Sequence, residues 1–189
     1  AIKMDESFVP AWGNIGTALL NEGRHHEALP AIQKVLELDP NNTTAHMNLG
    51  GIYQDLGKLD QALASTLKSL ELKPKNPDAL SNLGAIYSNL RLYANALTAT
   101  LESIEIQPNN HNSYINLSEI YKSINDMPKA IESINHAIKL DAQDANAHLH
   151  SGRISLETGN SIKAEQSLLK SIELNEELPE SHRYLSIIL

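Results

Sequence analysis

The segment Asn-Leu-Gly-Gly-Ile-Tyr at residues 48–53 returns as Asn-Leu-Gly-Ala-Ile-Tyr at residues 82–87, 34 residues further along the chain. Fainter copies follow the same spacing, with Asn-Ile-Gly at residues 14–16 and Asn-Leu-Ser at residues 116–118. A fixed period of this size is typical of an array in which one small unit is stacked along the chain. The sequence therefore predicts repeats rather than a single globular domain.

The period divides the chain into five full repeats and two partial ones. Residues 1–8 match the tail of an earlier repeat, and residues 179–189 match the opening helix of a sixth. Because the first residues already belong to a repeat and the last three are apolar, we expect both termini to be cut. The full repeats are 9–42, 43–76, 77–110, 111–144 and 145–178.

Each repeat carries two apolar stripes at helical spacing. In the second repeat the first stripe contains Leu49, Ile52, Tyr53 and Leu56, and the other contains Leu59, Leu63, Leu67 and Leu70. Gly57 separates the two stripes and Pro74 follows the second, as expected of a turn and a helix end. Each repeat is thus predicted to be a pair of antiparallel helices.

First and second helices are predicted to follow one another along the whole chain, and the ends of each helix carry an uncertainty of two residues. No strand is predicted. A further helix is expected to begin near Glu180. The predicted ranges are 9–22, 26–39, 43–56, 60–73, 77–90, 94–107, 111–124, 128–141, 145–158 and 162–175.

This pattern strongly resembles the tetratricopeptide repeat (TPR) family, whose 34-residue units are helix–turn–helix pairs. Counting from the start of each repeat, the family's small residue at position eight is present as Gly16, Gly50, Gly84, Ser118 and Gly152. Its alanine at position twenty is present as Ala28, Ala62, Ala96, Ala130 and Ala164. The resemblance implies an all-α fold, a right-handed α-solenoid whose first helices line a concave wall. Ser151 and Ser155 stand where the second and third repeats carry leucine and tyrosine, so we expect the fifth repeat to pack more weakly.

Composition narrows the possible partners. The net charge of −8 and the pI of about 5.4 argue against nucleic acid, which favours a basic face. No apolar stretch is long enough to insert into a membrane. Cysteine is absent, which excludes disulfides and thiolate sites and fits a reducing compartment such as the cytoplasm.

The candidate site is a row of polar residues on the first helices. The family resemblance implies that these residues face the concave side of the array. Primary amides both donate and accept hydrogen bonds, which suits the alternating groups of an extended peptide backbone. The row resembles the asparagine ladder of O-GlcNAc-transferase-like TPR arrays, which binds peptide main chain. Position six of successive repeats reads Asn14, Asn48, Asn82, Asn116, His150 and Tyr184. The alternative is that these asparagines serve the array itself.

Position nine of the first helices completes the candidate groove. Its small members leave room for a bound chain, while Glu119 and Arg153 either set the polarity of the ligand or form an ordinary solvated ion pair. Position nine reads Thr17, Gly51, Ala85, Glu119 and Arg153. Sequence preference is expected from variable inward residues, namely Met47, Gln54, Ser81, Ile115, Lys122 and Leu149.

Other specific chemistry is not predicted. Of the side chains in the family's two-carboxylate clamp, only Asn48 is matched. His46, His148 and His182 occupy position four, where a ring is expected to pack between helices, and no histidine spacing indicates a metal site. No cofactor, metal or catalytic residue is predicted.

Three functions remain open. The leading hypothesis is a protein-interaction scaffold that holds an extended peptide or a partner helix in its groove. The second is the substrate-recruiting region of a larger enzyme, because residues 63–72 resemble second helices found ahead of glycosyltransferase or sulfotransferase domains. The third is an assembly factor that docks on folded subunits or self-associates through its exposed ends.

Overall fold

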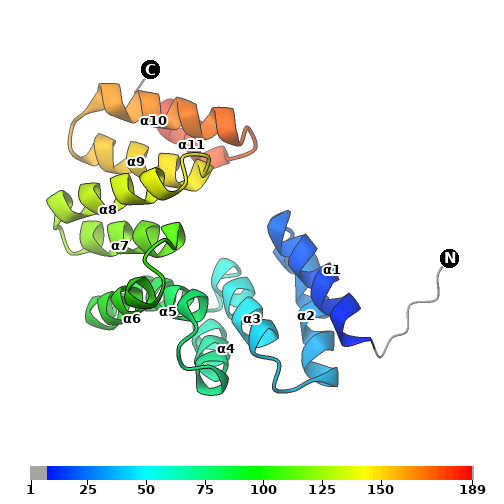
Figure 1. The fold of residues 1–189 in the computed structure, drawn as a ribbon. Helices are drawn as coiled ribbons and strands as arrows, with labels where there is room; N and C mark the ends of the chain where they lie inside the picture. The colour runs from blue at the N-terminus through cyan, green and yellow to red at the C-terminus, as the bar shows by residue number, and fades with distance from the viewer. Residues whose placement is uncertain (1–7, 189) are drawn as a thin grey trace. The chain divides into compact units, whose positions relative to one another are not determined.

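The computed structural model describes residues 8–188, and all regular secondary structure within them is α-helical (Figure 1). The chain divides into two compact units, with the boundary between Arg91 and Leu92. The N-terminal unit contains α1 (Val9–Asn21), α2 (His25–Leu38), α3 (Thr43–Asp55), α4 (Leu59–Leu72) and α5 (Pro77–Asn89). The C-terminal unit contains α6 (Tyr93–Ile106), α7 (His111–Ser123), α8 (Met127–Leu140), α9 (Ala145–Glu157), α10 (Ser161–Leu174) and α11 (Pro179–Leu185).

The predicted all-α fold of helix–turn–helix repeats is confirmed. The bounds of α1 to α10 agree with the predicted ranges within the stated two residues, and α11 begins at Pro179 rather than Glu180. The match of residues 1–8 to an earlier repeat falls mostly outside the described residues. In each unit every odd-numbered helix contacts the next odd-numbered helix, so the first helices of successive repeats lie side by side.

The turn inside each repeat uses one residue with a left-handed backbone at position fifteen. The φ angles there lie between 61° and 75°. Glycine adopts this conformation freely and asparagine tolerates it, whereas Arg91 bears a cost of about 1–2 kcal/mol. The five residues are Gly23, Gly57, Arg91, Asn125 and Gly159.

The two helices of the second repeat approach each other closely at Gly50. A Cβ placed on this glycine would overlap the Thr66 hydroxyl and lie 3.4 Å from the carbonyl oxygen of Ala62. Only small side chains fit along this line, so Ala62, Thr66 and Ser69 are the buried residues of α4. The prediction of a leucine stripe on this helix is therefore wrong at Leu67, which is 44% exposed.

Buried serines join the second helix of a repeat to the start of the first helix. The hydroxyl of Ser69 donates to the carbonyl of Thr43 at 3.0 Å, and that of Ser171 donates to the carbonyl of Ala145 at 2.8 Å. Ser171 also shares a hydrogen bond of 2.8 Å with Ser181 in the following repeat. Thr43 and Ala145 are the first residues of α3 and α9, so each hydroxyl adds a hydrogen bond between the two helices of its repeat.

Histidines at position four tie each first helix to the preceding loop. The ring nitrogen donates to a loop carbonyl six residues earlier, and the packing of these rings between helices stays a prediction. The Nε2–O distances are 2.9 Å for His46 to Pro40, 3.2 Å for His148 to Ala142 and 3.0 Å for His182 to Glu176.

Each unit has its own apolar core. Ser151 and Ser155 of the fifth repeat are also buried, and the Oγ of Ser151 lies 3.2 Å from the Oγ of Ser167. This hydrogen bond replaces part of the apolar contact, and the weaker packing of the fifth repeat stays a prediction. The core residues of the N-terminal unit are Ala28, Ile32, Val35, Ala45, Leu49 and Ile52. Those of the C-terminal unit are Ile115, Ala130, Ile134, Ala137, Ala147 and Ile154.

Candidate functional site

The candidate residues on neighbouring first helices lie side by side in a regular pattern. Position nine of one first helix lies beside position six of the next, and we call each such neighbouring pair a rung. A Cβ built on Gly51 would lie 3.9 Å from Nδ2 of Asn82, which shows how near the two positions are. The rungs within the two units are Thr17 with Asn48, Gly51 with Asn82, Glu119 with His150, and Arg153 with Tyr184.

The first rung borders a pocket of about 280 Å³ in the N-terminal unit. Its apolar wall is built from Val9 and Gly13 of α1, Ile32 and Val35 of α2, and Ala45 of α3. Three of the predicted groove residues, Asn14, Thr17 and Asn48, border the same pocket together with Asn42 and Thr44. The structure therefore brings amide groups and an apolar cavity to one place.

The amides of this unit are available to a ligand. Asn14 is exposed, while Asn48 and Asn82 are half-buried. Among residues 8–188 none of these three side chains has a hydrogen-bond partner, whereas Asn116 on α7 does take part in an interaction. Their neighbours Thr17 and Gly51 are small. The rungs of the N-terminal unit are thus open.

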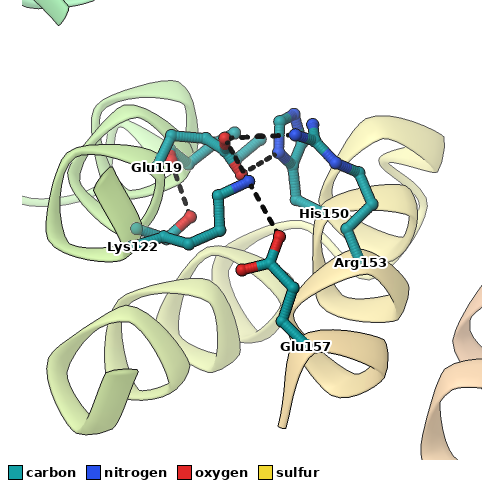
Figure 2. Close-up of polar contacts among 7 residues, drawn as sticks. Glu119, Lys122, His150, Arg153 and Glu157 are labelled. Carbon is teal, nitrogen blue, oxygen red and sulfur yellow. Dashed lines mark hydrogen bonds and ion pairs between the residues drawn. The ribbon is translucent and has the colours of Figure 1, made fainter. Parts of the chain in front are cut away.

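The rungs of the C-terminal unit are occupied by the chain's own side chains (Figure 2). Glu119 of α7 points between Lys122 of the same helix and two residues of α9, His150 and Arg153. Its carboxylate oxygens lie 2.8 Å from Nζ of Lys122, 2.8 Å from Nδ1 of His150 and 3.5 Å from Nη2 of Arg153. Glu157 of α9 lies 3.7 Å from the same lysine nitrogen.

This network holds Glu119 ionised. Burial by itself would raise the pKa of its carboxyl group. The hydrogen bond and charge of His150, the charge of Arg153 and the hydrogen bond of Lys122 act in the opposite direction and lower the pKa to about 2. The Glu119 and Arg153 side chains are each 23% exposed, so their contact is a partly buried ion pair rather than the solvated one considered above.

The next rung of the C-terminal unit is also closed. The guanidinium carbon of Arg153 lies 5.6 Å from the centre of the Tyr184 ring on α11, within the range of a cation–π contact. A ligand that reached these positions would have to displace contacts already made within the chain. The binding roles of Glu119, His150 and Arg153 therefore stay predictions.

Comparison with known families agrees with the repeat pattern. Models described as tetratricopeptide repeat match residues 9–42 and 31–64, and one such model matches 77–110, 111–144 and 145–178. A further model described as TPR repeat matches residues 51–90. The chain belongs to the tetratricopeptide repeat family. This membership supports a role as a protein–protein interaction scaffold.

Solved TPR structures share the fold at low sequence identity. "TTC0263", a thermophilic TPR protein of Thermus thermophilus, is 19% identical with a TM-score of 0.86, over 96% of this chain and 100% of that one. The APC/C hetero-tetramer Cut9-Hcn1 contains a chain that is 22% identical, with a TM-score of 0.82 over 98% of this chain and 37% of that chain. YrrB, a TPR protein with an unusual peptide-binding site, is 21% identical with a TM-score of 0.57, over 97% of this chain and 94% of that chain. No curated protein matches the chain.

The variable inward residues need a correction in this TPR chain. Ser81, Ile115 and Leu149 are 3%, 7% and 3% exposed, so they are part of the packing and do not face a ligand. All three stand at position five of their repeats. Lys122 is held by the Glu119 network, and Met47 and Gln54 remain half-buried.

Sequence reasoning did not recognise the pocket beside Asn14. Its signal is Gly13, the glycine at position five of the first repeat, where the other repeats carry a side chain. Among the described residues no cluster of histidine, aspartate and glutamate side chains has the arrangement of a metal site. None of the described helices is long and apolar enough to span a membrane.

Proposed function

We propose that the chain is a protein-interaction scaffold that binds the main chain of an extended peptide along the first helices of its N-terminal unit. The observation that carries this proposal is the open row of Asn14, Asn48 and Asn82, whose amides have no hydrogen-bond partner among residues 8–188. Small residues at Thr17 and Gly51 leave space beside them. Ala85 stands at position nine of α5 in the same unit.

The spacing of the row suits an extended ligand. Packed helices lie about 8–10 Å apart, and a strand rises about 3.3 Å per residue. One amide on each first helix would therefore meet a peptide group about every third residue of the ligand. Each amide can donate to a carbonyl and accept from an N–H, so recognition would not depend on the ligand's side chains at these points.

The test is a triple substitution in the full chain. A peptide selected from a random display library is titrated against wild type and against Asn14→Ala/Asn48→Ala/Asn82→Ala. Loss of three hydrogen bonds of about 0.5–1.5 kcal/mol each should weaken binding by one to three orders of magnitude.

The matched control is Asn95→Ala, which removes an exposed amide from α6. It should leave affinity within about twofold. Thermal unfolding shows whether the triple variant is still folded, and alanine is compatible with all three helical positions. If the triple variant is less stable but its folded fraction binds the peptide with unchanged affinity, the asparagines serve the array and the proposal is wrong.

A further inference from the structure

The pocket beside Asn14 corresponds to a missing side chain. Position five of the five repeats reads Gly13, Met47, Ser81, Ile115 and Leu149. In the fourth repeat Ile115 is only 7% exposed and packs in the core with Ile134, Ala137 and Ala147.

The same core positions recur in the first repeat. Three periods earlier, the neighbours of Ile115 correspond to Ile32, Val35 and Ala45. All three line the pocket at its floor, where they are only 1–3% exposed, and Gly13 stands at the place of Ile115. The first repeat thus keeps the residues that surround Ile115 in the fourth repeat, but it has glycine where the fourth repeat has that isoleucine side chain.

We propose that this pocket is a specificity site that binds one aliphatic side chain of a peptide, of the leucine, isoleucine, valine or methionine class. This proposal rests on the proposed function and adds a sequence preference to it. The chain itself supplies the model for the occupant, because Ile115 fills the equivalent space between the equivalent residues. An aliphatic group in this pocket leaves no polar atom without a partner.

The border of the pocket fits the rest of such a ligand. Asn14 and Asn48 lie at its edge, where their amides can bind the peptide groups on either side of the buried side chain. No residue that lines the pocket is charged. A charged ligand side chain would therefore be desolvated without a counter-charge, which is strongly unfavourable.

The probes are five acetylated and amidated pentapeptides, Ala-Ala-X-Ala-Ala, in which X is leucine, isoleucine, valine, alanine or aspartate. Each is titrated into the full chain labelled at its methyl groups and followed by NMR. The leucine peptide should shift the methyl signals of Ile32, Val35 and Ala45 saturably. Its affinity should exceed that of the alanine peptide by about tenfold to fiftyfold, and the aspartate peptide should not shift these signals.

Two substitutions at one position separate filling of the pocket from loss of glycine. Gly13→Ile reproduces the fourth repeat and should abolish the preference for leucine over alanine. Gly13→Ala adds only a methyl group and should retain most of that preference. Both should fold, because a Cβ on Gly13 meets nothing nearer than Val35 Cγ2 at 4.0 Å.

Several results would overturn the proposal. Equal binding of the leucine and alanine peptides, or an unchanged preference in Gly13→Ile, would exclude the pocket but leave the asparagine row intact. Shifts of the Asn14 and Asn48 amide signals without any at the pocket methyl groups would do the same. Methyl shifts that appear on raising the protein concentration alone would show that a second copy of the chain is the occupant.

Discussion

Replacing Glu119 by glutamine removes the negative charge that Lys122, His150 and Arg153 share. The carboxyl pKa falls from about 4.5 in the unfolded chain to about 2 in the folded one. At about 1.4 kcal/mol per pKa unit, this difference corresponds to about 3 kcal/mol of stability in favour of the ionised, folded state. Because Glu119 is mostly buried, solvent screens little of this contribution.

The sign of the pH dependence follows from the lowered pKa. The stabilisation is almost fully present above pH 4.5 and is lost as the pH falls toward 2, where Glu119 is half protonated in the folded chain. The difference in free energy of unfolding between wild type and Glu119→Gln should therefore be about 3 kcal/mol at pH 7. It should shrink steadily below pH 4.5 and nearly vanish near pH 2.

Urea denaturation followed by circular dichroism at pH 7, 4, 3 and 2 measures this difference, because urea adds no ionic screening. Glu102→Gln is the control, since Glu102 is an exposed carboxylate on α6, and its effect should stay within about 0.5 kcal/mol. Hydrogen exchange should show the loss in α7 and α9 first, because stability in a repeat array is set by neighbouring helices. A difference that is the same at every pH would refute the assignment of the stabilisation to the ionised carboxylate.

The buried hydroxyls give two further predictions, both measured by urea denaturation at neutral pH. Ser171→Ala should cost about 1–3 kcal/mol, because it removes two hydrogen bonds and leaves the buried Ser181 hydroxyl without its Ser171 partner, whereas Ser69→Ala, which loses one bond, should cost about 1 kcal/mol. If Ser69→Ala proves the more damaging of the two, the serine pair is not what stabilises that joint. Thr66→Val should instead stabilise the chain by about 1 kcal/mol, because the Thr66 hydroxyl is buried beside Gly50 with no hydrogen-bond partner among the described residues. A loss of stability in Thr66→Val would mean that the hydroxyl is satisfied in solution.

The 34-residue period was sufficient to predict the helices and their order, because the spacing of apolar residues and the turn at position fifteen repeat without insertion. It did not predict which side chains of the second helices are buried. Ala62, Thr66 and Ser69 are buried and Leu67 is 44% exposed, and the close approach of Gly50 to Ala62 and Thr66 leaves room only for small side chains at those two positions. Hydrophobicity alone ranks these residues in the wrong order.

The site was predicted in the same uneven way. The asparagines were placed correctly on the first helices, yet the contrast between open and closed rungs depends on pairs that the sequence separates by 31 residues, such as Glu119 and His150. The pocket arises because Gly13 lacks a side chain, and this is noticed only when Gly13 is compared with Ile115 at the same position of another repeat. A count of polar residues cannot reveal either feature.

Each rung takes one residue from each of two successive repeats. The side chains of a rung are therefore set by which two repeats are neighbours, and not by either repeat alone. A tandem duplication of residues 43–76 would create a new junction in which Gly51 faces a second copy of Asn48. The added pair would have the same small-residue and amide character as the pair of Gly51 with Asn82. Unequal recombination within this gene could thus add one pair of a small residue and an amide to the row without any point mutation. Duplication of residues 111–144 would instead place Glu119 beside Asn116 and leave that glutamate without the histidine it now contacts.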